Sequence, residues 1–248
     1  MRDHVVLVTG AGQGMGRVHS LGLARRGAIV GVLDNEAQPA SETCAQIESA
    51  GGRAMELVVD VADRARTEAA VAELHGRFGR LDAIISNAGT VHSNAGLVDT
   101  EDEDWGRTIA VHVGGALNVC RAGMPLLVHS PCPRVVIVSS MWAQRGPGFG
   151  YAYCAAKGAL LAFARNLAVE FGPQGVCVNA LTPGSVPTRM AADFGPEDIA
   201  RDSLDIPLGR WGEAEEISEL VCFLASPAAS YVTGQTIAVN GGQVIAGY

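Results

Sequence analysis

Positive charge is scarce in this chain and lysine is almost absent. One lysine and seventeen arginines face 26 acidic residues, for a formal net charge of −8. No basic run could collect phosphates, so nucleic acid is not expected as the main partner. No apolar run reaches about 18 residues, the length of a membrane-spanning helix, so no membrane partner is expected either. The first apolar strand is expected to begin at Val5, too early for a signal peptide, so we expect a cytoplasmic protein.

Paired cysteines are also lacking. The six cysteines are scattered, and no two of them form a Cys-x-x-Cys pair. This spacing favours buried, reduced thiols over a zinc site or a disulfide framework. The dense acidic cluster at 101–104 is typical of the start of a helix, where carboxylates interact with the helix dipole. We therefore expect no metal site.

Short apolar runs recur along the chain, and most are apolar throughout instead of alternating. This pattern is typical of strands buried on both faces of a parallel sheet. The predicted strands are 5–9, 28–33, 54–59, 83–86, 135–139, 176–181 and 236–239. The helical patterns between them include 17–26, 64–78, 104–127, 151–171 and 213–224.

This alternation predicts an α/β fold, namely one Rossmann-type doubly wound domain over 1–248, with a seven-stranded parallel sheet and helices on both faces. Its cofactor half is expected at about 1–135, and its catalytic and substrate half at about 136–248. The longest segment without a regular pattern, 182–212, is rich in glycine and proline. A loop of that length in a compact domain is usually functional, for example as a lid.

A glycine-rich turn, Thr9-Gly10-Ala11-Gly12-Gln13-Gly14-Met15-Gly16, separates the first predicted strand from the first helix. Glycines let the backbone approach a pyrophosphate closely, and the start of a helix supplies N–H donors. The spacing is G-x-x-x-G-x-G, and such turns can also serve tight packing. Their place between a strand and a helix favours dinucleotide binding.

Asp34 ends the second predicted strand, eighteen residues after Gly16. A carboxylate at this place can accept hydrogen bonds from both hydroxyls of an adenosine ribose, and it repels a 2′-phosphate. No arginine or lysine lies near enough in sequence to reverse that charge, since Asn35 follows. Asp34 therefore predicts NAD(H) as the cofactor, and the alternative is a solvated carboxylate at the end of a strand.

The only lysine, Lys157, follows Tyr153 by four residues, one turn of a helix. A compact ammonium at that distance can lower the pKa of a phenol from about 10 towards neutrality, where the phenol can pass a proton. The alternative is a tyrosine and a lysine that share an exposed helix face.

With these motifs, Asn87-Ala88-Gly89 and Ser140, the chain resembles the short-chain dehydrogenase/reductase family along its whole length. The resemblance implies that Tyr153 is the catalytic acid/base and that Lys157 lowers its pKa and holds the nicotinamide ribose. It implies that Ser140, thirteen residues before Tyr153, orients the substrate oxygen. It also implies a set of cofactor-binding residues: Gly10, Gln13, Gly14, Met15, Gly16, Asp34, Asp60, Val61, Asn87, Ala88, Gly89, Tyr153, Lys157, Pro183, Gly184, Val186 and Thr188.

One catalytic position departs from the family pattern. His112 stands forty-one residues before Tyr153, where the family usually has an asparagine thought to hold a water that links the lysine to solvent. A histidine could relay protons there, since its free pKa is near 6.5. It could equally be a buried neutral side chain that only packs, or mark a site that binds NAD without turnover.

The segments expected to border the substrate are aromatic and apolar: Met141, Trp142, Phe149, Met190 and Trp211. They predict an NAD(H)-dependent secondary-alcohol dehydrogenase or ketone reductase for a hydrophobic alicyclic, terpenoid or steroid-like small molecule. The alternatives are a 3-oxoacyl-carrier-protein reductase and a catalytically weak NAD-binding sensor. The predicted helix 151–171 is apolar on several faces. Because the family mostly forms tetramers through its long helices, the resemblance predicts a homotetramer.

Overall fold

Seven parallel strands form the centre of the structure, a computed structural model that describes residues 1–91, 95–146, 148–188, 191 and 194–245. Every strand pairing is parallel, and the order across the sheet is β3-β2-β1-β4-β5-β6-β7. The strands are β1 Val5–Thr9, β2 Ile29–Asp34, β3 Arg53–Val58, β4 Ala83–Ser86, β5 Arg134–Val138, β6 Cys177–Pro183 and β7 Thr236–Val239.

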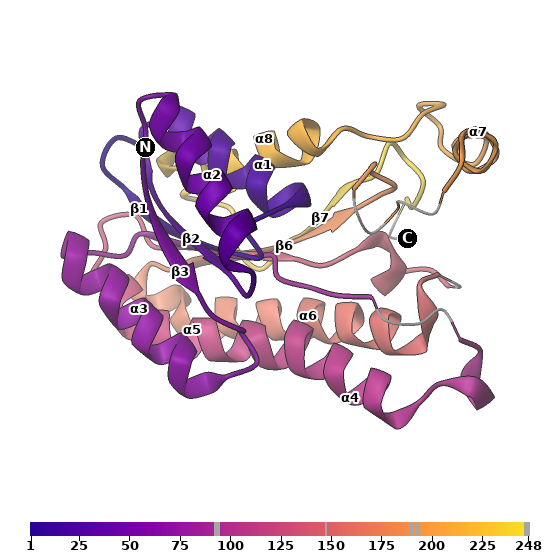
Figure 1. The fold of residues 1–248 in the computed structure, drawn as a ribbon, viewed down its shortest axis with the longest axis horizontal. Coiled ribbons are helices and arrows are strands. Elements are labelled where there is room, and N and C mark those ends of the chain that lie inside the picture. Colours follow the sequence, from indigo (N-terminus) through magenta and orange to yellow (C-terminus); the bar gives the residue numbers. More distant parts are fainter. Residues whose placement is uncertain (92–94, 147, 189–190, 192–193, 246–248) are drawn as a thin grey trace.

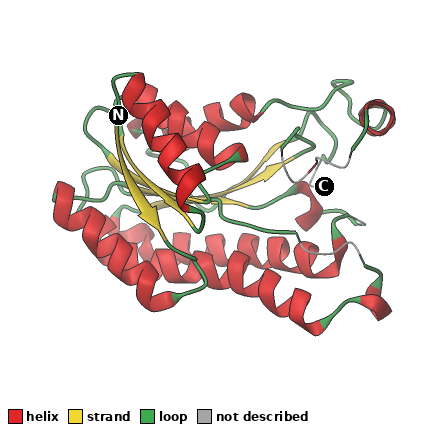
Figure 2. Ribbon diagram, viewed as in Figure 1, coloured by secondary structure: helices red, strands yellow, loops and turns green. Residues whose placement is uncertain are grey.

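Helices cover both faces of this sheet (Figures 1 and 2). On one face lie α1 Gly14–Arg25, α2 Ala37–Ser49 and α8 Ala214–Leu224. On the other lie α3 Arg64–Phe78, α5 Gly115–Leu127 and α6 Gly150–Phe171. Two shorter helices, α4 Asp102–Ile109 and α7 Pro196–Ser203, extend beyond the sheet.

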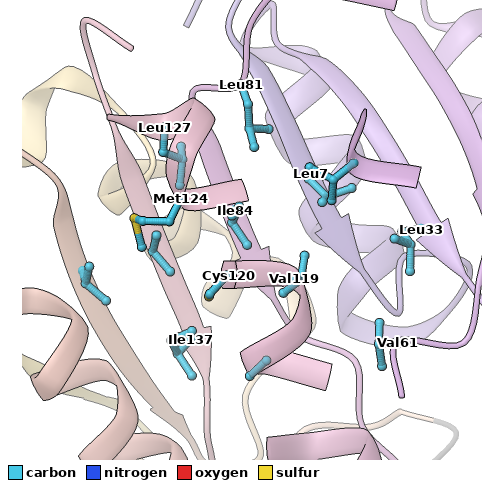
Figure 3. Packing of buried hydrophobic residues seen from close by; sticks show 14 of the residues in the cluster. Leu7, Leu33, Val61, Leu81, Ile84, Val119, Cys120, Met124, Leu127 and Ile137 are labelled. Carbon is cyan, nitrogen blue, oxygen red and sulfur yellow. The ribbon is translucent and has the colours of Figure 1, made fainter. Parts of the chain in front are cut away.

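The composition of β1 explains this layering. Val5 and Leu7 belong to the core on one face, and Val6 and Val8 to the core on the other. Because successive side chains of a strand point to opposite faces, a strand that is apolar at each position needs cover on both sides. Figure 3 shows strand residues of the first core packed against side chains of α5.

The strand order sets where a ligand can bind. The chain runs outward from β1 through β2 to β3, and then returns to β4 on the other side of β1. The connections that leave the carboxyl ends of β1 and β4 therefore diverge, which opens a crevice at that edge of the sheet. The predicted seven-stranded doubly wound fold is confirmed.

The predicted strands 5–9, 83–86 and 236–239 match the structure, and the other four differ by one or two residues at their ends. The predicted helix 104–127 is interrupted: a π-helical turn, Ala110–Gly114, separates α4 from α5. The sequence pattern did not single out α2.

The expectation of an irregular segment over 182–212 is wrong in part, because the segment contains α7. Pro196 stands at the start of this helix, and the backbone N–H of Gly195 donates to the Asp198 carboxylate at 3.1 Å. These are helix-start signals. Hydrophobic periodicity could not reveal α7, because Ile199 is its only large apolar residue.

Candidate active site

The turn between β1 and α1 has a backbone that requires glycine. Gly10 and Gly14 have φ angles of +61° and +51°. A Cβ added to Gly16 would lie 1.9 Å from the carbonyl oxygen of Gly10, and one added to Gly10 would lie 2.9 Å from the Cα of Ala88. The turn therefore packs against the end of β4, with no room for side chains at Gly10 and Gly16. Gly14 and Met15, in the first turn of α1, face the adjoining cleft.

This cleft has a volume of about 660 Å³ and lies at the carboxyl ends of the strands. Pockets for small molecules and cofactors typically measure about 300–1,000 Å³. Most of the predicted cofactor-binding residues line it: Gly10, Gln13, Gly14, Met15, Asp34, Asp60, Val61, Asn87, Ala88, Gly89, Tyr153, Lys157 and Thr188. Gly16, Pro183, Gly184 and Val186 are not among the lining residues.

The ends of β1 and β4 are joined by hydrogen bonds beneath the cleft. The hydroxyl oxygen of Thr9 accepts from the backbone N–H groups of Asn87 and Ala88, each at 3.0 Å. The side-chain amide of Asn87 donates in return to the carbonyl oxygen of Thr9 at 3.0 Å. These bonds fix the glycine turn relative to the Asn87-Ala88-Gly89 segment.

Asp34 lies at the end of β2 and is 4% exposed. Its carboxylate lines the cleft and accepts hydrogen bonds from the backbone N–H groups of Gly12 at 2.8 Å and Glu36 at 3.1 Å. A guanidinium does lie close in space, which sequence neighbours could not show. Arg17 donates to the carbonyl oxygen of Gly12 at 2.8 Å, but its charge is paired with Glu42 at 3.0 Å.

Asp60 lines the same cleft and forms an ion pair that the sequence did not suggest. Its carboxylate accepts from the backbone N–H of Ala62 at 2.9 Å and from Arg107 of α4 at 2.7 Å. Burial alone would raise the pKa of Asp60, but these hydrogen bonds outweigh it and hold the pKa below its ordinary value. Arg107 was missed because the fold, and not sequence proximity, brings it to Asp60.

Ser140, Tyr153 and Lys157 are all buried where β5 meets α6. The Tyr153 hydroxyl is hydrogen bonded to the Ser140 side chain, and the Ser140 oxygen accepts from the backbone N–H of Trp142 at 3.2 Å. The Lys157 ammonium lies 5.5 Å from the centre of the Tyr153 ring and donates to the carbonyl oxygen of Val138 at 2.9 Å. Ser139 is engaged elsewhere, since its hydroxyl donates to the Lys157 carbonyl at 2.7 Å.

The expectation that Lys157 acidifies Tyr153 is wrong for this structure. Burial raises the pKa of Tyr153 to about 12, and the hydrogen bond with Ser140 lowers it only in part. Burial also lowers the pKa of Lys157 to about 7. Both groups lose water, and loss of water disfavours each charged form. The four-residue spacing brought the two side chains together but could not report this desolvation.

His112 lies in the π-helical turn, is 1% exposed and packs against Tyr153. The two rings meet edge to face with centres 5.4 Å apart. His112 Nε2 faces the backbone of Thr90, where it either accepts from the N–H at 3.0 Å or donates to the carbonyl at 2.8 Å, depending on the tautomer. A Cβ at Gly89 would lie 2.4 Å from the imidazole. The relay and packing hypotheses for His112 both remain predictions.

The predicted substrate-bordering residues do not share one position. Phe149 lines the cleft, and Trp142 packs against Phe149 with ring centres 6.4 Å apart. Met141 is 2% exposed and Trp211 is 8% exposed, and neither is among the lining residues. Met190 lies outside the described residues.

Among the described residues, no group of three or more His, Cys, Asp or Glu side chains could hold a metal ion. No helix in the described part of the chain has the length and apolar character needed to cross a membrane.

Comparison with known proteins gives matches along nearly the whole chain. A family model described as enoyl-(acyl carrier protein) reductase matches residues 10–243. The chain is 36% identical to the short-chain reductase protein NovJ of Streptomyces niveus, over 98% of this chain and 94% of that protein. It is 33% identical to the 3-oxoacyl-[acyl-carrier-protein] reductase FabG of Escherichia coli K12, over 96% of each chain.

Solved structures match over the same extent. Levodione reductase superposes with a TM-score of 0.94 and 30% identity, over 98% of each chain. Carveol dehydrogenase from Mycobacterium avium in complex with NAD gives a TM-score of 0.92 and 30% identity, over 98% of each chain. A gluconate 5-dehydrogenase from Burkholderia cenocepacia in complex with NADP and tartrate gives a TM-score of 0.93 and 28% identity, over 98% of this chain and 96% of that chain. Proteins similar to this chain therefore differ in cofactor and in substrate.

Proposed function

Because this chain belongs to the short-chain dehydrogenase/reductase family, we propose that it is an NAD(H)-dependent oxidoreductase that interconverts a hydrophobic secondary alcohol and its ketone. The observation that carries the proposal is that the predicted catalytic side chains and the glycine turn share one cleft. Tyr153 and Lys157, with Ser140 bonded to Tyr153, lie in the same cleft as the glycine turn. The turn fits a dinucleotide, because Gly10 and Gly16 let its backbone pack closely against the end of β4, and the start of α1 faces the cleft with its N–H groups.

Tyr153, Ser140 and Lys157 have different roles in proton transfer. When bound, the nicotinamide cofactor supplies or accepts the hydride. With a pKa of about 12, Tyr153 holds its proton and can donate it to a carbonyl oxygen during reduction. The Ser140 oxygen accepts from the Trp142 N–H, and its hydroxyl, which is hydrogen bonded to Tyr153, is placed to bind and orient a substrate oxygen that enters between them. As negative charge develops on Tyr153, an ammonium at Lys157, 5.5 Å from the ring, stabilises it.

Asp34 supports NAD(H) over NADP(H). Its carboxylate lines the cleft, both of its oxygens are held by backbone N–H groups, and the nearby Arg17 is paired with Glu42. A 2′-phosphate placed there would meet a fixed negative charge with no unpaired cation on the same turn to offset it.

The cofactor assignment is tested by the dissociation constants of NADH and NADPH, measured by fluorescence titration. We expect NADH to bind at least tenfold more tightly. Asp34→Asn should narrow this ratio, whereas Glu48→Gln, on the exposed face of α2, should leave it unchanged. Tighter binding of NADPH by the wild-type protein would contradict the assignment.

The reaction is tested by NADH oxidation over a panel of ketones, with Tyr153→Phe as the blank. Loss of the phenol proton should lower kcat by about 10²–10⁴, the usual contribution of a general acid. NADH binding by Tyr153→Phe should persist. Equal rates for the two proteins with each ketone would remove Tyr153 from the mechanism.

A second candidate function is the reduction of 3-oxoacyl thioesters, which the 33% identity to FabG favours. It predicts activity with acetoacetyl thioesters and preference for NADPH. Asp34 argues against the second of these features. The sensor alternative predicts NADH binding without turnover of any ketone or thioester, so the same panel distinguishes all three.

A further inference from the structure

Phe149, directly before α6, has a backbone conformation that disfavours its side chain. Its φ of +48° and ψ of 27° lie in the left-handed region. In the described part of the chain, Asp3 is the only other residue besides glycines with a positive φ. A Cβ in this region is crowded by the following carbonyl oxygen, and a bulky aromatic residue there is an outlier.

The glycines beside Phe149 show that a residue without strain was possible at this position. Gly148 and Gly150 stand on either side of it, and Gly150 has a φ of +78°. Glycine would adopt the backbone of residue 149 without strain, yet this position carries a phenylalanine. Strain of this kind persists where the side chain has a role that offsets it, and it concentrates at ligand sites.

The ring of Phe149 contacts three other aromatic rings from three segments. Its centre lies 5.6 Å from that of Tyr153, 6.4 Å from that of Trp142 and 6.4 Å from that of Phe194. The Trp142 ring packs against Gly148, where an added Cβ would lie 2.3 Å from the ring. Packing thus fixes the ring of Phe149 beside the proposed proton donor.

Phe149 and Phe194 also line the cleft, as Tyr153 and Lys157 do. Among the described residues, the charged side chains that line the cleft besides Lys157 are those of Asp34, Glu36, Asp60 and Arg107, all within the expected cofactor half. A substrate whose oxygen reaches Tyr153 therefore places its adjacent carbons against aromatic faces. Rings meet such faces favourably in tilted or edge-to-face geometry, which a saturated chain cannot reproduce.

Resting on the proposed function, we propose that Phe149 is a specificity-determining residue, and that it selects ketones and alcohols with a planar ring next to the reacting carbon. The substrate class is thereby narrowed from hydrophobic compounds in general to aryl and fused-ring ketones. Straight-chain ketones and 3-oxoacyl thioesters have no such ring, so contact with Phe149 favours their binding less.

The test compares three ketones of eight carbons: acetophenone, with a planar ring; cyclohexyl methyl ketone, with a puckered ring; and 2-octanone, with a straight chain. Because their intrinsic reactivities differ, the measured quantity is the change in each ratio of kcat/KM between wild type and variant. Phe149→Leu keeps most of the side-chain volume and removes the aromatic face. It should lower the ratio of acetophenone to 2-octanone about three- to tenfold, the value of one aromatic contact.

Phe223→Leu is the control, because it makes the same substitution on α8, at a phenylalanine that does not line the cleft. It should leave all three ratios unchanged. An equilibrium readout accompanies the kinetics: the Kd of acetophenone in the presence of NAD⁺, by calorimetry, should rise by a similar factor in Phe149→Leu. Phe149→Gly, which relieves the backbone, should melt about 2–4 °C above Phe149→Ala.

Unchanged ratios and an unchanged acetophenone Kd in Phe149→Leu would overturn the inference while leaving the proposed function intact. If the wild-type protein reduces none of the three ketones and matches Tyr153→Phe, the proposed function fails instead. The calorimetric comparison still decides the role of Phe149 in that case, because it needs no turnover.

Discussion

At the scale of single residues, burial controls the charges on which catalysis depends. Burial moves the pKa of Tyr153 up to about 12 and that of Lys157 down to about 7, so near neutral pH Tyr153 is uncharged and Lys157 is only partly charged. A proton gained by Lys157 favours loss of the proton from Tyr153, since opposite charges stabilise each other most where water is excluded. The two groups therefore titrate as a coupled unit, and either pKa alone describes it incompletely.

His112 offers a test at this scale, because it touches both the Tyr153 ring and the Thr90 backbone. We expect His112→Phe to lower kcat at least tenfold, since phenylalanine can neither relay a proton nor bond to Thr90. NADH binding should persist. His112→Asn, which keeps a hydrogen-bonding side chain, should retain more activity. Steady-state kinetics over pH 5–9 checks this, and a kcat for His112→Phe equal to that of wild type would end the relay hypothesis.

Asp82 is a second test, at the opposite end of the sheet from the cleft. Its fully buried carboxylate accepts from Arg80 at 2.7 and 2.8 Å, from Ser130 at 2.5 Å and from the Val5 N–H at 2.8 Å. Burial by itself raises the pKa of Asp82, but these hydrogen bonds outweigh it and leave the pKa below its ordinary value. The resulting stability is present above the unfolded pKa, near 3.9, and is lost as pH falls through the folded pKa.

Asp82→Asn should therefore lower the free energy of unfolding at pH 7 by about 2–3 kcal/mol, the usual value of hydrogen bonds to a buried charge. It should also flatten the loss of stability between about pH 4 and pH 2. Urea unfolding at each pH measures both. Glu68→Gln removes a carboxylate from an exposed pair with Arg64 and should change stability by less than about 1 kcal/mol. A pH dependence identical to that of wild type would show that Asp82 is not the group responsible.

At the scale of secondary structure, α7 shows what side-chain placement adds to sequence. Asp202 lies near the carboxyl end of α7, where a negative charge opposes the helix dipole. Its carboxylate accepts instead from Ser185 at 2.7 Å and from the Gln243 side chain at 3.3 Å. The backbone of Gln243 in turn accepts from Arg145 at 3.4 Å. Asp202 thus ties α7 to the segment after β6 and to the turn after β7.

Asp202→Ala should raise the KM for ketones about three- to tenfold, because α7 follows Phe194, which lines the cleft, and loses hydrogen bonds to a charged group that contribute about 1.5–3 kcal/mol. The Kd of NADH should change less than twofold. Asp205→Ala removes an exposed carboxylate three residues later and is the matched control. Steady-state kinetics, with limited proteolysis of the 194–212 region, provides the measurement. Equal KM values for the two variants would argue that Asp202 does not position α7 and the adjoining Phe194 for substrate binding.

The elements also show why some predictions succeeded. Strands such as 5–9 were predictable because burial on both faces leaves a continuous apolar run. The four-residue spacing of Tyr153 and Lys157 on α6 placed both in the cleft. Arg107 was not predicted, because the fold and not sequence proximity brings it to Asp60. The pKa of Tyr153 was mispredicted because it depends on excluded water, which sequence spacing does not encode.

At the scale of the whole molecule, α6 suggests assembly. Its outward face carries Tyr151 at 52% exposure and Val169 at 80%, with Ala155, Ala159 and Ala162 exposed between them. Small residues on one face let a second helix approach closely, and an apolar face on a long helix favours burial. We propose a homotetramer that uses this face.

Light scattering should then give a mass of four copies of 25.7 kDa. Ala159→Arg should reduce the assembly to smaller species, because it places a long charged side chain in the interface. Ala69→Arg, on the exposed face of α3, should leave the mass unchanged. A monomer in the wild-type sample would contradict the proposal.

The solitary lysine has a practical corollary for handling this protein. Lys157 is 4% exposed, so reagents that couple to primary amines reach little besides the terminal amine. Dyes, biotin esters and sensor chips would attach at one defined end, and every copy would be presented in the same orientation. Glutaraldehyde, which chiefly bridges pairs of amines, should barely cross-link it.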